Sequence, residues 1–164
     1  MFDYVEIETD EQIKQLCDLA REIWNEYSIC FINQDQIDYM LDKFQSEQVI
    51  KSQINFQKYK YYFLENDGEN FGYFGFQKQK DCLFLSKFYI NKQYRGQGYG
   101  RKAFLVMNEM ARELELPKIR LTVNKYNFVA VCAYEKLGFE RVGEAETDIG
   151  NGYIMDDYIY EYVL

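Results

Sequence analysis

The pattern of apolar and polar positions along the chain predicts alternating strands and helices. Residues 10–27 repeat apolar side chains at helical spacing, which is typical of a helix with one buried face. Residues 58–65 and 70–79 are instead apolar and aromatic runs bounded by turn residues, which is typical of strands. We predict strands at 2–8, 58–65, 70–79, 82–90, 118–123, 139–146 and 153–164, and helices at 10–27, 35–44, 47–54, 98–114 and 127–138.

The order of these elements indicates one α/β domain over residues 1–164. The length suits a single domain of ordinary size, and no stretch rich in Ser, Gly or Pro reads as a linker. We expect a mixed sheet of about seven strands with about four to five helices. Gly138 closes the helix at 127–138 as its C-cap, where glycine adopts a left-handed conformation easily.

Composition and charge narrow the classes of function. The chain has 19 basic and 27 acidic residues, a net charge of −8, which argues against nucleic acid as the main partner. It contains no histidine, so the commonest metal ligand and general base is missing, and we expect no metal. No apolar run is long enough for a membrane span, and the first residues lack the basic and apolar regions of a signal peptide, so we expect none. With four widely spaced cysteines we expect a cytoplasmic protein, and we leave a homodimer open.

A glycine-rich stretch, "YRGQGYG" at 94–100, precedes the helix predicted at 98–114. Glycine allows positive φ and lets backbone amides approach an anion at the start of a helix. Arg95 and Arg101 flank the glycines with positive charge. We therefore predict a turn that binds phosphate or pyrophosphate, the alternative being a tight strand-to-helix turn without a ligand. A dinucleotide fingerprint would need the spacing G-x-G-x-x-G, so that interpretation is weaker.

Two motifs give this chain a family resemblance. "RGQGYG" has the pattern R-x-x-G-x-G, and "NFVAVCAYEKLGF" at 127–139 has the pattern N-x-x-A-x-x-x-Y-x-x-x-G-F. In this order the motifs resemble the GCN5-related N-acetyltransferase (GNAT) family. The resemblance implies the GNAT fold, in which two central parallel strands splay apart, and acetyl-coenzyme A as co-substrate.

The same resemblance implies where the coenzyme binds. The end of the strand at 82–90 would contact the pantetheine arm and the acetyl group, and the glycine turn would hold the pyrophosphate. Asn127 would bond the pantetheine arm, cap its helix, or do both. The implied residues are Phe88, Tyr89, Ile90, Arg95, Gly96, Gln97, Gly98, Tyr99, Gly100, Arg101 and Asn127.

The implied chemistry is direct transfer of an acetyl group to a primary amine. Tyr134 occupies the position of the family's general acid, and a phenol is protonated at neutral pH and able to donate to the leaving sulfur. The alternative is a core aromatic, since the chain has 16 tyrosines. Relatives often carry a glutamate base on the strand before the turn. Ser86 and Lys87 stand there in this chain, so we assign no base, and a water chain, another carboxylate or the substrate itself stay open.

The acceptor site is expected to come from the first two helices and the last strands, with candidate residues near the end of the helix at 10–27. Carboxylates beside aromatic rings suit an ammonium group, and the alternative is a solvated acidic face around a core tryptophan. The helical region is loosely similar to bacterial polyamine acetyltransferases, so a polyamine is the first expected acceptor. Acetylation of protein or peptide N-termini, and a sensor that binds acetyl-coenzyme A without turnover, stay open. The candidate acceptor residues are Glu22, Trp24, Glu26 and Tyr27.

Overall fold

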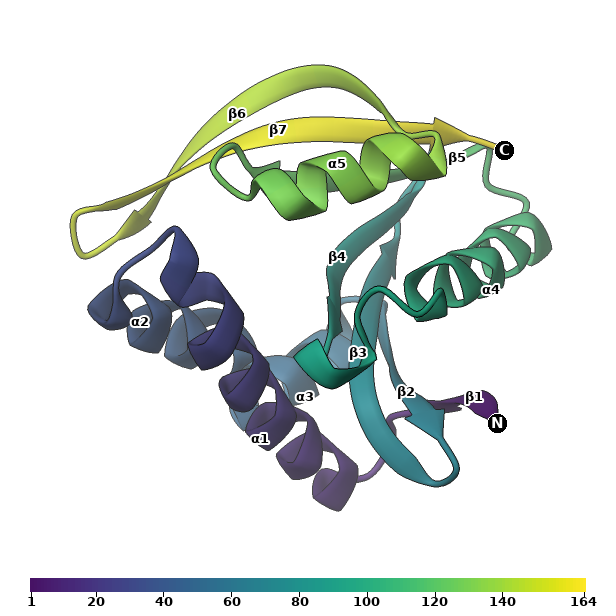
Figure 1. Ribbon diagram of the computed structural model, residues 1–164, viewed down its shortest axis with the longest axis horizontal. Coiled ribbons are helices and arrows are strands. Elements are labelled where there is room, and N and C mark those ends of the chain that lie inside the picture. The colour runs from purple at the N-terminus through teal and green to yellow at the C-terminus, as the bar shows by residue number, and fades with distance from the viewer. The chain divides into compact units, whose positions relative to one another are not determined.

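The computed structural model describes the whole chain, Met1–Leu164, as seven strands, five α-helices and two short 3₁₀ helices (Figure 1). The strands form one sheet in the order β1-β2-β3-β4-β5-β7-β6. The strands are β1 (Phe2–Glu6), β2 (Tyr59–Asn66), β3 (Glu69–Lys78), β4 (Leu83–Ile90), β5 (Lys118–Asn124), β6 (Glu140–Gly150) and β7 (Tyr153–Val163). The helices are α1 (Asp10–Tyr27), η1 (Ser28–Cys30), α2 (Gln34–Gln45), α3 (Glu47–Phe56), η2 (Lys92–Tyr94), α4 (Tyr99–Glu113) and α5 (Phe128–Leu137).

The predicted α/β fold with a mixed seven-stranded sheet is confirmed, and each predicted element is present. The largest difference is β6, which continues to Gly150 instead of ending at residue 146. Its second half is polar and alternates weakly, but it pairs with β7 up to Gly150 and Tyr153. Pairing with a neighbour thus extends a strand beyond what its own side chains indicate. None of the helices has the length and apolar character that crossing a membrane requires.

The chain forms two compact units, which are described separately. The first contains 1–77 and 87–103, and the second contains 78–86 and 104–164. Strand β4 and helix α4 each contribute residues to both units. The expectation of one domain over the whole chain stays a prediction.

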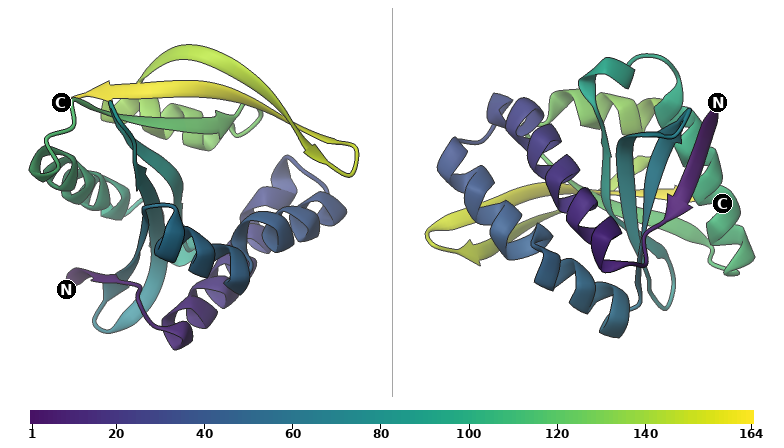
Figure 2. Two further views of the ribbon diagram at one scale, coloured as in Figure 1. Left: turned by 180° about the vertical axis from the view of Figure 1, so that it is seen from behind. Right: turned by 90° about the horizontal axis from the view of Figure 1, so that it is seen from below.

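In the first unit, three helices accompany the antiparallel strands β1, β2 and β3. Helix α1 begins with a capping box, in which the Thr9 side chain accepts from Gln12 N and the Gln12 side chain accepts from the Thr9 amide. Helices α1, α2 and α3 pack against one another (Figure 2). The core is aromatic and includes the fully buried Tyr61, Tyr73 and Phe63. The Tyr73 hydroxyl donates to Gln45 Oε1 at 2.7 Å, so the buried phenol keeps a polar partner.

In the second unit, helix α5 lies along the sheet of β5, β7 and β6 (Figure 1). The Tyr160 hydroxyl of β7 donates to Glu135 Oε2 of α5 at 3.1 Å, and Phe139 packs on Phe104 with ring centroids 5.4 Å apart. Strands β4 and β5 run parallel and pair at Leu83–Ile119 and Phe84–Arg120. The antiparallel pairing of β5 with β7 is longer and continues to Asn124. This short parallel pairing agrees with the splayed strands that the family resemblance implies.

Candidate functional site

The glycine turn between β4 and α4 has the backbone conformation that glycine permits. Gly96 and Gly98 have φ of +74° and +85°, in the left-handed region. A Cβ built on either would meet no atom within 4 Å, so the turn is open on that side. Gly100 has no positive φ, and a Cβ there would lie 3.8 Å from Ile90 Cδ1, an ordinary contact. The conformation of the turn therefore requires two of the three glycines.

Helix α4 begins directly after this turn and offers amides to an anion. In its first turn Lys102 N donates to Gly98 O at 3.1 Å. The backbone amides that precede Lys102 in the helix have no acceptor within it. These amides carry the positive end of the helix dipole. The exposed Arg101 and Lys102 add two charges in the first turn. Sequence reasoning did not select Lys102, although the signal was the basic pair that directly follows the glycines.

Arg95 is directed toward α1. Its two Nη atoms donate to the two carboxylate oxygens of Glu26 at 3.1 and 2.8 Å, and its Nε donates to Ile90 O at 2.8 Å. The guanidinium also lies 4.7 Å from the centre of the Tyr27 ring. Arg95, which was expected at the coenzyme, therefore lies in one cluster with Glu26 and Tyr27, which were expected at the acceptor. The two parallel hydrogen bonds join opposite charges in a fixed geometry, so Arg95 anchors the turn to α1 through Glu26.

The end of β4 carries half-buried side chains at Phe88, Tyr89 and Ile90. The Tyr89 ring packs between Trp24 of α1 and Tyr73 of β3, with centroids 5.5 Å away in each case. Trp24 is 7 % exposed and belongs to the core. An effect of Trp24 on an acceptor would therefore pass through the position of Tyr89.

The remaining acceptor candidate, Glu22, lies exposed on α1. Its Oε1 accepts from Asn91 Nδ2 at 3.2 Å, directly after β4. The structure thus brings Glu22 and Glu26 to the segment that follows β4, each through a residue of that segment. This proximity was not evident in the sequence, since the two residues that each bond joins are 69 positions apart.

A buried lysine lies on β4 near the position where relatives carry a base. Lys87 Nζ donates to the Tyr61 hydroxyl at 2.8 Å, and that hydroxyl donates to Gln53 Oε1 at 2.5 Å. Burial lowers the pKa of Lys87 to about 8, because the charged form loses its hydration. Gly75 makes room for this arrangement, since a Cβ there would lie 2.4 Å from Tyr61 Cε1. The hydrogen bond to Tyr61 can be donated by charged or neutral lysine.

Helix α5 holds the second motif. Asn127 is its N-cap, with Oδ1 accepting from Ala130 N at 3.3 Å, so the expected capping role is confirmed. Gly138 ends the helix at φ +105°, as predicted. Tyr134 is half-buried and meets Phe139 edge to face at 5.5 Å. These residues belong to the second unit, whereas 88–101 belong to the first.

Comparison with known proteins gives a family for most of the chain. Residues 18–139 match the family described as acetyltransferase (GNAT) family. A thialysine N-epsilon-acetyltransferase from Sus scrofa is 36% identical over 64 residues, which are 39% of this chain and 38% of the relative. A probable spermine N(1)-acetyltransferase from Bacillus subtilis subsp. natto is 31% identical over 65 residues, 39% of this chain and 43% of the relative. The matches span about two fifths to about half of the length of the curated relatives.

A solved structure is similar over the full length. The PaiA N-acetyltransferase from Thermoplasma acidophilum, crystallised in complex with coenzyme A, superposes with a TM-score of 0.82. The match covers 100% of this chain and 99% of that chain at 19% identity. At this identity the likeness shows a common fold.

Proposed function

Since the chain belongs to the acetyltransferase (GNAT) family, with residues 18–139 matching it, we propose that it transfers the acetyl group of acetyl-coenzyme A to a primary amine of a small molecule. The observation that carries this proposal is the turn at 94–100. Its two left-handed glycines leave one side open, and its amides lead into the start of α4. A turn of this kind suits a pyrophosphate, because amides and the helix dipole both favour negative charge.

We propose a place for each part of the coenzyme. We assign the pyrophosphate to Gly96, Gln97, Gly98, Tyr99, Gly100 and Arg101, with Lys102 adding charge. Arg95 supports the turn through Glu26. Phe88, Tyr89 and Ile90 would contact the pantetheine arm and the acetyl group, and Asn127 would contact the arm while it caps α5. The proposal includes no metal.

Direct transfer requires two proton movements. An amine of pKa about 10 must lose a proton before it attacks, which costs about 4 kcal/mol at neutral pH. The sulfur that leaves must gain a proton, and we assign that donation to the Tyr134 hydroxyl. Replacing Tyr134 with Phe keeps the ring against Phe139 and removes the proton, so kcat should fall about 100- to 10,000-fold with the coenzyme affinity unchanged. Full activity of this variant would return Tyr134 to a packing role.

For the acceptor we propose a small cationic amine, with a polyamine as the first choice. The net charge of −8 and the printed name of the Bacillus relative, a probable spermine N(1)-acetyltransferase, support this choice. Glu22 and Tyr27 are the accessible members of the α1 set, whereas Glu26 is paired with Arg95 and Trp24 is buried.

The test combines coenzyme binding with turnover. Calorimetry measures acetyl-coenzyme A affinity, and thiol release is followed with polyamines, amino acids, aminoglycosides and peptides with free N-termini. Gly98→Asp places a negative side chain at the turn and should weaken coenzyme binding at least about tenfold. Gly68→Asp is the matched control, because Gly68 has φ +81° and equally open surroundings in the β2–β3 turn. Equal affinity of both variants would contradict the assignment, and binding without turnover would indicate a sensor.

A further inference from the structure

Strand β7 carries a buried carboxylate that the proposed function has not used. Asp157 is 6 % exposed, and its Oδ1 has no hydrogen-bond partner. Buried polar atoms in folded proteins nearly always have a partner, and a buried charge without one is strongly unfavourable. Burial, with a smaller contribution from the charge of Asp156, raises the pKa of Asp157 to about 6.

The register of the sheet places Asp157 on the face that α5 does not cover. Tyr160 of β7 donates to Glu135 of α5, and the Tyr162 ring packs against Phe139, which follows α5. The β5–β7 register is regular from Val163 to Asp157, so odd-numbered residues of β7 point to the opposite face. On that face Asp157 lies opposite Asn124 of β5 and Ala145 of β6, neither of which is charged.

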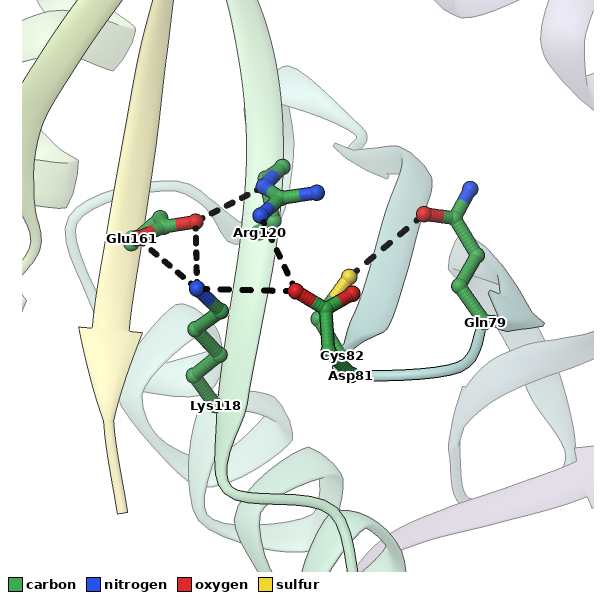
Figure 3. A network of polar contacts seen from close by, with 6 residues as sticks. All are labelled: Gln79, Asp81, Cys82, Lys118, Arg120 and Glu161. Carbon is green, nitrogen blue, oxygen red and sulfur yellow. Dashed lines mark hydrogen bonds and ion pairs between the residues drawn. The ribbon is translucent and has the colours of Figure 1, made fainter.

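The same face shows how this sheet treats a carboxylate that it does pair. Four residues along β7, Glu161 accepts from Arg120 Nε at 2.7 Å and pairs with Lys118 Nζ at 3.1 Å (Figure 3). The nearest cation in sequence to Asp157, Lys125, pairs instead with Asp156 at 2.8 Å and with Glu144 at 3.1 Å. Successive side chains of a strand point to opposite faces, so Asp156, and with it the ion pairs of Lys125, lies on the face opposite to Asp157. Asp157 is thus left without a cation in a sheet that supplies one to Glu161 and to Asp156.

From this geometry we propose that Asp157 binds the ammonium group of the acceptor and takes its proton. The proposal deepens the proposed function and rests on it. A primary ammonium supplies both the positive charge and the donor that Oδ1 lacks. In a site with so little water the attraction between the two charges is strong. Asn124, which lies opposite Asp157, is the last residue of β5 and comes three residues before the N-cap of α5. Asp157 therefore lies beside the end of β5 that leads to the second motif.

The transfer balances with Asp157 as proton acceptor and Tyr134 as donor. The R–NH₃⁺ group gives one proton to the Asp157 carboxylate, and the freed nitrogen lone pair attacks the thioester carbonyl carbon. The carbon–sulfur bond breaks, and the Tyr134 hydroxyl protonates the sulfur. The amide nitrogen returns a proton to the tyrosinate, and Asp157 releases its proton to solvent. The products are the acetylated amine, coenzyme A as a thiol, and one proton.

The experiment compares two Asp→Asn substitutions on adjacent residues. Asp157→Asn keeps the size of the side chain and removes the charge, and it should lower kcat/KM for the amine about 100- to 10,000-fold with unchanged coenzyme affinity. Asp156→Asn is the control, because it makes the same chemical change on the other face. A second measurement needs no turnover: spermine should raise the unfolding temperature of the wild type and of Asp156→Asn, but not of Asp157→Asn.

The outcomes separate this inference from the proposed function. Wild-type kcat/KM in Asp157→Asn, or an equal rise in unfolding temperature with amine in both variants, would overturn the role of Asp157 and leave the transferase intact. Failure of the proposed function would appear as coenzyme binding without thiol release from any amine. In that case the unfolding temperatures still decide whether Asp157 binds ammonium, and the absence of any rise in the wild type would overturn it.

Discussion

Glu161 and Asp157 lie on one face of one strand, four residues apart, and have opposite environments. Burial alone would raise the pKa of Glu161, but hydrogen bonds from Arg120 and Lys118 outweigh it and the pKa is lowered. At Asp157 burial acts without such partners, and the pKa rises to about 6. Side chains facing the two acids from β5 differ accordingly: Arg120 lies opposite Glu161, and Asn124 lies opposite Asp157.

This difference teaches that the cation missing at Asp157 is a property of its place in the sheet. The strand and the face are shared, so the difference comes from the residue opposite on β5, which is Arg120 at Glu161 and Asn124 at Asp157. A pKa of about 6 suits a group that must accept a proton and release it near neutral pH. The comparison predicts that neutralising the two acids changes stability in opposite directions.

The largest expected effect is a gain in stability from Asp157→Asn at neutral pH. The folded protein binds the proton of Asp157 more tightly than the unfolded chain does, so the wild type loses stability as the pH rises from 3.8 to about 6. This difference corresponds to about 3 kcal/mol. Urea unfolding should show the Asn variant gaining up to that amount relative to wild type between pH 3.5 and pH 7.5. A difference that does not change with pH would contradict the uncompensated charge.

The next effect has the opposite sign and concerns Glu161→Gln. The pKa of Glu161 is lowered in the folded state, so its contribution is present above the unfolded pKa of 4.5 and is lost as the pH falls below it. Since the side chains of Glu161, Lys118 and Arg120 are 16 to 30% exposed, we expect a loss of about 1 to 2 kcal/mol at pH 7. The same urea series should show the loss disappearing in acid. Equal stability of variant and wild type at pH 7 would show that the network contributes nothing.

The smallest effect comes from giving Asp157 the cation it lacks. Ala145→Lys places an ammonium directly opposite Asp157 on β6, and it should lower the pKa of that carboxyl below about 6 and add about 1 kcal/mol of stability. Ala145→Gln is the uncharged control of similar length. A titration of Asp157 followed by NMR measures the change, and thiol release should fall because the new ammonium competes with the acceptor. Full activity beside a lowered pKa would contradict proton transfer to Asp157.

Much of the fold could be predicted from the sequence because local patterns and tertiary structure agree. The spacing in α1, the turn residues between strands and the Gly138 helix end each correspond to an element. Strand β6 was predicted too short because its last residues carry little apolar signal and depend on pairing with β7. The glycine turn could be located because left-handed glycines before a helix are a local feature.

The chemistry between elements was harder to predict. Arg95 appeared as a coenzyme contact because it stands beside the glycines, but its partner Glu26 is 69 residues away. Asp157 gave no signal, because "DD" within a strand reads as an exposed, polar edge until the register assigns each acid to a face. Lys87 was noted only as the absence of a glutamate, since its burial against Tyr61 depends on strands distant in sequence.

The space at Gly75 has a consequence for how this sequence can change over time. Any larger residue at position 75 would displace the Tyr61 ring, and Lys87 would then lose the hydroxyl that accepts its hydrogen bond. A substitution at Gly75 is therefore unfavourable unless the residue at position 61 changes as well. Gly75 and Tyr61 should therefore be inherited together, and a larger residue at position 75 becomes possible only in descendants that carry a smaller side chain at position 61.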